Sequence, residues 1–373
     1  MTVELPVDKK SKIKKLLYKF KKIKRCSIRN FAKFVGSLES CCPTLKYGRV
    51  HMRSLERERY VALTNNNENY NAIMTLSNEV SNDLQWWIDH INFARDSILV
   101  RNPDLEIFTD ASLSGWGAFC NGRRIHGHWN AEEKNWSINR LELKAVSFGL
   151  KCLTDNVSNS NILLRVDNTT ALAYINRKGG TRYPDLHTIA KEIWDWCKKN
   201  NNWIFASYIC SADNAEADFE SRRLEPETEY SLAQSAFEKI IDKFGVPDMD
   251  LFASRTNSKC EKFVSWKKDP EAFAIDAFTL NWNSDFFYAF PPFILIPRVL
   301  EKIKQDKCNG IIVVPQWPAQ PWYPMFMNLL QSDFIKFEPD INLLSSLDRL
   351  PHPLWKRLTL VAGILSGQPS RKN

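Results

Sequence analysis

The periodicity of the sequence changes near residue 104, and this change constrains the fold more than any other feature. Three short runs in which apolar and polar residues alternate follow one another with Gly and Asn between them: LEIFTDAS, GWGAFCNG and RRIHGHWN. They predict an antiparallel meander of three strands. After it we expect a helix (about 140–154), a strand (NILLRV), two helices, a strand (WIFASYI) and a last helical segment within CSADNAEADFESRR. This order predicts an α/β fold with a mixed sheet covered by helices.

The segments before and after this middle part show other patterns of apolar residues. Residues 1–103 show helical spacing of apolar residues, as in SIRNFAKFVGSLESC and LSNEVSNDLQWWIDHINFA. A Glu/Pro-rich stretch, RRLEPETEY, marks an expected boundary near 223–230. Beyond it, FFYAF, a helix from FILIPRVLEKIKQDK and GIIVVP predict a parallel crossover unit and a second α/β domain. We therefore expect domains at 1–103, 104–226 and 227–373.

Four carboxylates stand at the ends of the predicted elements of the middle domain. Asp110 closes the first strand, Asp167 closes the fourth, Glu142 lies in the first turn of a helix, and Asp218 follows the last strand. Sites in open α/β sheets form beyond strand ends, so these side chains can converge only through the fold.

Each carboxylate also has a structural explanation. Asp110 and Asp167 can cap turns, Glu142 suits the dipole of a helix N-terminus, and Asp218 can begin a short helix. As a set, however, hard oxygen ligands without Cys or His match the preference of Mg²⁺ or Mn²⁺. Two such ions can activate water and stabilise the leaving oxygen of a phosphodiester.

The net charge of +8 is concentrated at the N-terminus. Residues 1–29 hold eleven Lys and Arg against two acidic residues, so the rest of the chain is nearly neutral. This basic arm suits phosphate backbones or an acidic membrane surface, and a solvated charged helix is an equal alternative. Its apolar residues recur at helical spacing: Ile13, Leu16, Leu17, Phe20 and Ile23.

The spacing of the cysteines and the length of the apolar runs argue against several classes of protein. The nine Cys form no C-x-x-C pair, which argues against a disulfide framework or zinc knuckle and favours reduced thiols in an intracellular protein, cytoplasmic or nuclear. No apolar run is long enough for a transmembrane helix, and Lys and Arg interrupt the early apolar runs, unlike a secretory signal. We expect no membrane partner.

Four segments carry a resemblance to a known family: FTDASLSGWGAF, INRLELKAV, LLRVDNTTALAYINRKGG and NAEADFESR. They resemble the ribonuclease H domain of retroelement polymerases, most of all that of DIRS-like retrotransposons, which carry a tyrosine recombinase. The resemblance implies a ribonuclease H-like fold over about 104–226. It also implies two-ion ligation and catalysis by Asp110, Glu142, Asp167 and Asp218, and cleavage of the RNA strand of an RNA/DNA hybrid.

The flanking segments extend the resemblance. The N-terminal third is similar to the thumb and connection segment that precedes ribonuclease H in these elements. No Asp-Asp dipeptide of a polymerase palm is present, so we expect no DNA synthesis from this chain alone and a polymerase-bearing chain of the same element as a partner. The chain is expected to be a fragment of a polyprotein, or a truncated or degraded element copy.

Residues 227–373 resemble a Rossmann-like methyltransferase domain that is expected to be degenerate. DLFASRTN offers Ala253 and Ser254 where a Gly-rich turn is needed, and Phe290–Pro291–Pro292–Phe293 lacks the polar acceptor of the corresponding motif. We expect a structural or docking role for this domain, and small-molecule methyl transfer is the less favoured alternative. No cofactor-binding residue is predicted.

Five residues near the carboxylates are candidates for substrate binding, because hybrids are recognised by shape and the 2′-hydroxyl. They are Ser112, Asn139, Arg140, Asn168 and Thr169. Asn139 is equally a helix cap and Arg140 a surface cation. The main alternative function is a catalytically inert nucleic-acid-binding or assembly remnant of the retrotransposon polyprotein.

Overall fold

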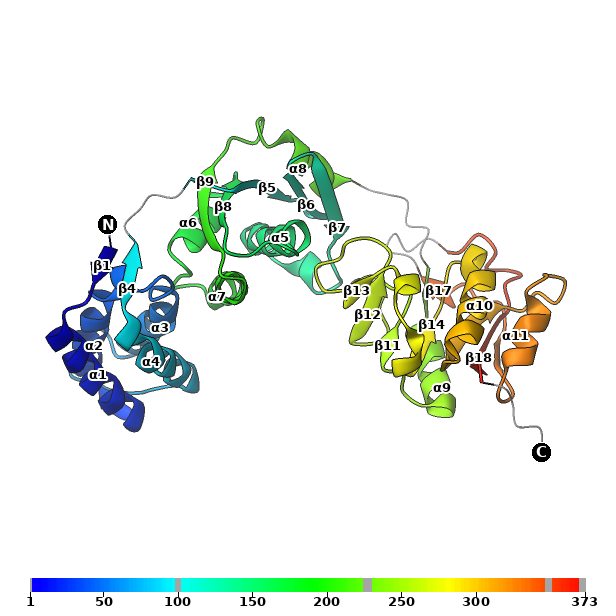
Figure 1. Cartoon of the computed structure of the whole chain (residues 1–373), viewed down its shortest axis with the longest axis horizontal. Helices are drawn as coiled ribbons and strands as arrows, with labels where there is room; N and C mark the ends of the chain where they lie inside the picture. Colours follow the sequence, from blue (N-terminus) through cyan, green and yellow to red (C-terminus); the bar gives the residue numbers. More distant parts are fainter. Residues whose placement is uncertain (1, 98–101, 224–229, 346–350, 369–373) are drawn as a thin grey trace. The chain divides into compact units, whose positions relative to one another are not determined.

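The computed structural model describes residues 2–97, 102–223, 230–345 and 351–368. The chain divides into two compact units (Figure 1): unit 1 comprises Met1–Gly127 with Glu133–Arg222, and unit 2 comprises His128–Glu132 with Arg223–Asn373. Within the described residues, no helix combines the length and the apolar character needed to cross a membrane. All nine Cys lie in these residues, and all are free.

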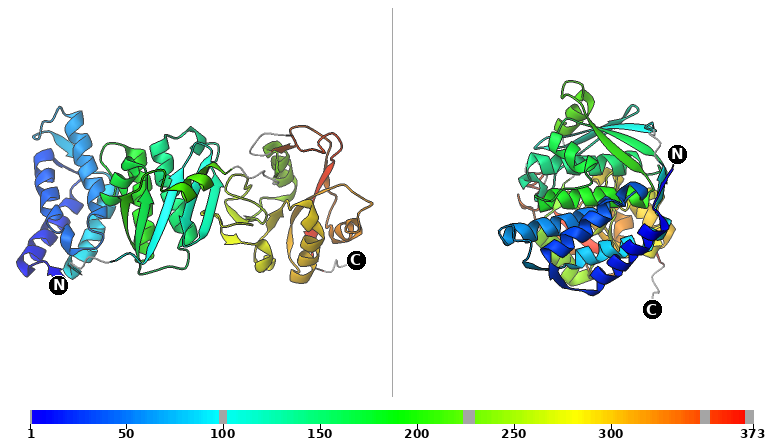
Figure 2. Two further views of the ribbon diagram at one scale, coloured as in Figure 1. Left: turned by 90° about the horizontal axis from the view of Figure 1, so that it is seen from above. Right: turned by 90° about the vertical axis from the view of Figure 1, so that its left-hand side faces the viewer.

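Unit 1 begins with helices that pack on one another (Figure 2) and with two pairs of short antiparallel strands. The helices are α1 (Val7–Lys22), α2 (Ile28–Glu39), α3 (Arg53–Asn65) and α4 (Asn78–His90). The strands are β1 (Thr2–Glu4) with β4 (Arg95–Ser97), and β2 (Arg25–Ser27) with β3 (Ile73–Thr75). The predicted helical character of this segment is confirmed.

Side chains explain where two of these helices begin and how α1 is held. Ser27 and Ser77 each accept a hydrogen bond from a backbone N–H of the following first turn, at Asn30 and Val80, which satisfies donors that the helix leaves unpaired. Most of the basic arm is the helix α1, which packs through its buried residues Ile13, Leu17 and Phe20. Its lysines are left mostly on the exposed face.

The rest of unit 1 follows the element order expected from the periodicity. The strands are β5 (Leu105–Ala111), β6 (Gly115–Cys120), β7 (Arg123–His128), β8 (Asn161–Val166) and β9 (Trp203–Tyr208). The helices are α5 (Ile138–Leu153), α6 (Thr169–Asn176), α7 (Pro184–Lys199) and α8 (Ala215–Arg222). The sheet order is β7-β6-β5-β8-β9, with β5 antiparallel to β6 and with β5, β8 and β9 parallel. The predicted mixed sheet is therefore confirmed.

Helices cover both faces of this sheet, as their contacts with β5 and β6 show. A Cβ on Gly149 of α5 would meet Thr109 and Ala118, which are paired across the two strands. The next pair, Asp110 and Gly117, faces the opposite side because side chains alternate along a strand, and α8 packs there. Figure 1 shows α5 and α8 on opposite sides of the sheet.

Unit 2 holds a sheet of order β13-β12-β11-β14-β15-β18-β16. Its parallel strands are β11 (Met249–Asp250), β12 (Lys262–Ser265), β13 (Ala274–Ile275), β14 (Phe287–Ala289) and β15 (Asn309–Pro315). The strand β18 (Leu360–Ser366) runs antiparallel to both β15 and β16 (Ile335–Phe337), and the short strands β10 (Ser231–Leu232) and β17 (Leu344–Ser345) pair separately. The parallel crossover from β14 to β15 confirms the expected unit.

Strand β15 shows that helices cover both faces of this second sheet. Ile311 and Val313 pack in one apolar cluster with α9 (Gln234–Phe244). Ile312 and Val314 pack in another with α10 (Ile296–Asp306) and α11 (Tyr323–Leu329). A strand buried on both faces reads as a continuous apolar run, which is the pattern of GIIVVP. Unit 2 is therefore a second α/β layer structure with its own core.

Candidate metal centre

The pairing of β5 with β8 brings two carboxylates together. The strands are parallel neighbours, with Phe108 opposite Arg165, so their carboxyl ends lie side by side. Asp110 lies near the end of β5, and Asp167 directly follows Val166, the last residue of β8. Two residues that are far apart in the sequence therefore meet at one edge of the sheet.

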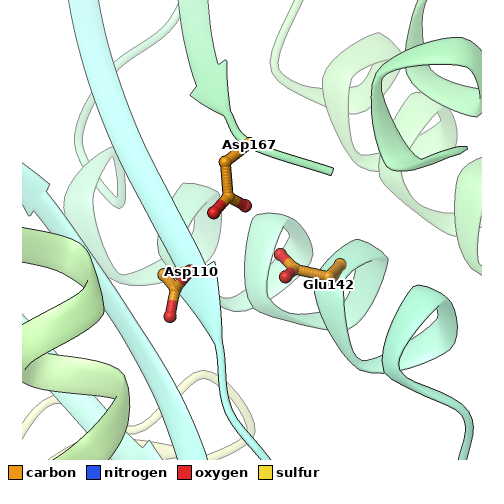
Figure 3. Close-up of side chains that lie close together, drawn as sticks. All are labelled: Asp110, Glu142 and Asp167. Atoms are coloured by element: carbon orange, nitrogen blue, oxygen red, sulfur yellow. The ribbon is translucent and has the colours of Figure 1, made fainter. Parts of the chain in front are cut away.

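Helix α5 supplies the third carboxylate. Glu142 lies in the second turn of this helix and not in the first, as predicted, because α5 already begins at Ile138. Its side chain is only 5% exposed. One ligand oxygen from each of Asp110, Glu142 and Asp167 lies within 4.8 Å of the others. Figure 3 shows the three side chains around a common space, from β5, α5 and the end of β8. The oxygens of these three residues form a single cluster, called here the acidic triad.

Two serine hydroxyls hold the aspartates of the acidic triad. Ser221 of α8 donates a hydrogen bond to Oδ2 of Asp110 at 2.5 Å. Ser211, in the segment between β9 and α8, donates to Oδ2 of Asp167 at 2.7 Å. The orientation of the acidic triad therefore depends on α8 and on the segment that leads into it.

Two carboxyl groups of the acidic triad, those of Glu142 and Asp110, have raised pKa values. Burial, with the negative charges of Asp110 and Asp167, raises the pKa of Glu142 to about 9. Burial also raises the pKa of Asp110; Asp167 and Asp218 add to this effect, while the hydrogen bond from Ser221 opposes it. Like charges this close favour the protonated form of one partner unless a cation neutralises them.

The acidic triad fits a hard divalent cation. Oε2 of Glu142 is buried and accepts no hydrogen bond from any described residue. A buried oxygen without a donor is unfavourable by a few kcal/mol, and a metal ion would satisfy it. The donor set contains only carboxylate oxygens, which are the ligands that Mg²⁺ and Mn²⁺ prefer.

The fourth predicted carboxylate lies outside the acidic triad. Asp218, in the first turn of α8, accepts a hydrogen bond from Nε of Arg222 at 2.8 Å and forms an ion pair with Nη2 of the same residue at 2.7 Å. Its charge still acts on Asp110, so it lies beside the cluster. The structure thus gathers three of the four carboxylates and pairs the fourth with an arginine.

Two predicted substrate residues hydrogen-bond each other next to the acidic triad. Nδ2 of Asn168 donates to Oδ1 of Asn139 at 2.9 Å. Asn168 also caps α6, since its Oδ1 accepts from the N–H of Ala171, whereas the residue at the cap position of α5 is Ser137. Asn139 therefore lies inside α5 and is not its cap, as the alternative had it, whereas Asn168 caps α6. Thr169 follows as the first, exposed residue of α6.

The other two candidates make contacts within unit 1. The hydroxyl of Ser112 donates to the carbonyl of Ser221 at 2.6 Å and accepts from the N–H of Gly115. The guanidinium of Arg140 lies 3.3 Å from the ring centroid of Trp136 and 3.7 Å from the carboxylate of Asp185. Ser112 thus joins the β5–β6 turn to α8, and Arg140 is held over an aromatic face.

Sequence reasoning missed Ser211, Ser221 and Arg222. Ser221 and Asp110 are 111 residues apart, and a serine in a polar segment has no distinguishing local pattern. The spacing of Asp218 and Arg222, four residues apart on one helix, is a signal that was available.

Comparison with known proteins gives structural likenesses alone, since neither a family model nor a curated protein matches the chain. Ribonuclease H1 from the halophilic archaeon Halobacterium salinarum NRC-1 is 19% identical at a TM-score of 0.27, covering 31% of this chain and 92% of that one. The foamy viral protease–reverse transcriptase in complex with an RNA/DNA hybrid is 12% identical at a TM-score of 0.22. This likeness covers 54% of this chain and 27% of that one. The same viral protein in complex with double-stranded DNA is 14% identical at a TM-score of 0.21. This likeness covers 55% of this chain and 41% of that one. The function must therefore be argued from the geometry of the site.

Proposed function

We propose that unit 1 is a ribonuclease H-like nuclease that cleaves the RNA strand of RNA/DNA hybrids. The observation that carries this proposal is the acidic triad, in which Asp110, Glu142 and Asp167 meet from β5, α5 and the end of β8. One buried oxygen of Glu142 accepts no hydrogen bond from any described residue. The resemblance of the surrounding motifs to retroelement ribonuclease H supports the choice of substrate. The expected domain boundaries, including the methyltransferase-like domain at 227–373, belong to the same proposal.

In this proposal Asp110, Glu142, Asp167 and Asp218 hold two Mg²⁺ or Mn²⁺ ions. When bound, such ions make water nucleophilic at neutral pH and stabilise the leaving oxygen of the phosphodiester. Ser221 and Ser211 orient the carboxylates of Asp110 and Asp167. Asp218 becomes a ligand when its ion pair with Arg222 breaks.

The substrate contacts are proposed for the residues around the acidic triad. Asn139, Asn168 and Thr169 lie at the beginnings of α5 and α6, where amide and hydroxyl groups can meet the 2′-hydroxyls that distinguish RNA from DNA. Arg140 offers a guanidinium for a phosphate, and Ser112 supports the turn beside them. A polymerase-bearing chain of the same element is the proposed protein partner.

The test is cleavage of a hybrid labelled on its RNA strand, with Mg²⁺ or Mn²⁺ present. The wild-type chain is expected to produce RNA fragments, and Asp110→Asn is expected to lower the rate at least about a hundredfold, since even outer residues of metal sites contribute 10–100-fold. Asp333→Asn is the matched control, because Asp333 is exposed in unit 2. Circular dichroism checks that both variants are folded.

The opposite result has a defined meaning. If the wild-type chain binds the hybrid with and without divalent ions and yields no fragments in either, the nuclease proposal is wrong. The chain is then the inert nucleic-acid-binding module that the sequence left as its alternative. Equal rates for the wild-type chain and Asp110→Asn would likewise refute the site.

A further inference from the structure

Within unit 1, the helical segment of residues 2–97 contacts α7 and the residues that follow it. The hydroxyl of Tyr47 donates to the carbonyl of Asn202 at 2.6 Å, directly after α7. Farther along the same helix, Lys191 forms an ion pair with Glu79 of α4 at 2.7 Å. We call this contact between the helical segment and α7 the joint. None of these residues belongs to the acidic triad or to the proposed substrate contacts.

Two imidazoles are buried at the joint. His51 lies in the short helix η2 (Val50–Met52), and His187 lies on α7. Their exposed fractions are only 5% and 4%. An imidazole becomes a cation when it binds a second proton, and a buried cation is unfavourable unless acceptors surround it. The partners of each ring therefore decide what acid does to the joint.

The ring of His51 has an acceptor at one nitrogen and a cation at the other. Its Nδ1–H donates to Oδ1 of Asp83 on α4 at 2.7 Å, and its Nε2 accepts from the ammonium group of Lys198 on α7 at 3.2 Å. A proton added at Nε2 would replace this acceptor with an N–H that faces the ammonium group. The neutral ring thus links the helical segment to α7, whereas the charged ring repels it.

The ring of His187 has no acceptor for either of its nitrogens. Neither Nδ1 nor Nε2 forms a hydrogen bond with any described residue. The backbone of Gly179 packs against the ring, since a Cβ added there would lie 2.6 Å from Nδ1. A protonated ring would bury two N–H donors and a positive charge without an acceptor, which is unfavourable.

The charged groups around His187 do not offset its burial. Burial is the main reason why its pKa lies below the ordinary value of 6.5. Lys191 on the same helix and Arg57 of α3 lower the pKa further, while Glu79 and Asp83 of α4 act against them. Lys191 and Glu79 are paired with each other, so their effects on the ring oppose one another.

The pKa of His51 is lowered as well, and again burial is the main cause. The hydrogen bond and the charge of Asp83 oppose this effect, the charge of Lys198 adds to it, and Asp195 of α7 opposes it. His90, an exposed imidazole of α4, stacks on the same indole ring as His51. Both buried rings are therefore neutral at pH 7.

We propose that the joint opens in acid, because protonation of His51 and His187 releases the helical segment from α7. In the open form both rings reach water, so this form takes up two protons that the closed form excludes. The form that binds more protons gains as pH falls, here below about 6.5, by at most about a hundredfold per pH unit. The proposal concerns the conformation of unit 1 and does not depend on the nuclease.

The experiment measures side-chain exposure by hydroxyl-radical footprinting of the full chain between pH 8 and 5, without divalent ions. Tyr47 is 8% exposed at the joint, and Tyr323, 9% exposed in unit 2, is the internal reference. As opening begins, the labelling of Tyr47 in excess of its value at pH 8 should rise by about tenfold or more per pH unit. Tyr323 should not change. Glu142 does not contribute, because its pKa of about 9 keeps it protonated throughout this range.

Two substitutions together remove the titrating rings. His51→Gln keeps a donor and an acceptor in the side chain, and His187→Leu removes no hydrogen bond with a described residue. The double variant should keep the labelling of Tyr47 at its pH 8 value down to pH 5.5. His352→Leu is the matched control, because it removes a half-buried imidazole of unit 2, and it should open like the wild-type chain.

Three results would overturn the proposal. They are a constant labelling of Tyr47 from pH 8 to 5, equal opening of the wild-type chain and the double variant, and a rise of Tyr323 together with Tyr47, which means unfolding of the whole chain. If the double variant does not fold, His187→Leu alone decides. It should reduce the uptake on opening from two protons to one, and an unchanged pH dependence would refute the role of this ring.

Discussion

For Glu142, the sequence pattern and the structure support the same interpretation. A carboxylate within the apolar run LELKAV has to face water, meet a cation or serve chemistry, and the structure excludes water because the side chain is 5% exposed. Its Oε2 has no donor among the described residues, and its pKa is raised to about 9. The residue is therefore suited to bind a cation, which the described residues of unit 1 do not supply.

The raised pKa predicts how stability depends on pH in the absence of divalent ions. In the folded protein Glu142 keeps its proton up to about pH 9, whereas in the unfolded chain it loses it near 4.5. Between these values the folded state binds more protons, so the free energy of unfolding falls as pH rises, by at most about 1.4 kcal/mol per pH unit. Thermal unfolding between pH 5 and 9 measures this fall.

Glu142→Gln should flatten this dependence, because the amide has no proton to lose. At pH 8, Mn²⁺ should raise the unfolding temperature of the wild-type chain more than that of the variant. Glu238→Gln, an exposed acid in unit 2, should behave like the wild-type chain. A wild-type stability that does not change between pH 5 and 9 would contradict the assignment.

At the scale of elements, the contact between β6 and α8 decides how the acidic triad is supported. Gly117, the strand partner of Asp110, has no room for a Cβ: one would lie 2.4 Å from the carbonyl oxygen of Ala217 and 2.5 Å from the backbone nitrogen of Ser221. Both contacts are with backbone atoms, which cannot move without moving the helix. Direct packing of α8 on the strand is what brings Ser221 to Asp110.

Gly117→Ala should therefore displace α8. We expect a loss of stability of about 1–3 kcal/mol from overpacking and a loss of hybrid cleavage larger than the loss of hybrid binding. Chemical denaturation and cleavage kinetics measure the two effects. Gly36→Ala, in α2 with no atom within 4 Å of the added Cβ, is the control and should leave cleavage unchanged. Full cleavage by a stable Gly117→Ala would refute the role of this contact.

Periodicity predicted the elements, but it could not predict the contacts between them. The order of strands and helices from β5 to α8 follows from alternation and helical spacing, which depend only on near neighbours in the sequence. The placement of Asp110, Asp167 and Glu142 followed from strand ends and a helix start. The hydrogen bond of Ser221 to Asp110 could not be predicted, because the two residues are 111 positions apart. The pairing of Asp218 with Arg222, in contrast, could have been predicted from their spacing of four residues on one helix.

On the scale of the whole molecule, the charge is unevenly distributed. α1 buries Ile13, Leu17 and Phe20, which leaves most of its lysines for solvent or for phosphates. Lys12 and Lys19, seven residues apart, lie on the same face of this helix and are both exposed. The sequence left two explanations for this arm, a contact with a phosphate backbone or a solvated helix, and salt dependence separates them.

Changing Lys12 and Lys19 to Gln together should reduce the salt dependence of hybrid binding. Each lost phosphate contact lowers the slope of log K against log salt concentration by about 0.9, so the double variant should lose about 2. Binding is measured in EDTA over a range of salt concentrations. The control changes Lys239 and Lys304, two exposed lysines of unit 2, to Gln. An unchanged slope in the α1 variant would identify a solvated helix.

The ion pair of Asp218 with Arg222 occurs at a particular place in the chain. Arg222 is the last residue of α8, and the next residue already belongs to unit 2. The residue that holds Asp218 is therefore the last residue of its unit, whereas Asp110, Glu142 and Asp167 belong to β5, to α5 and to the end of β8.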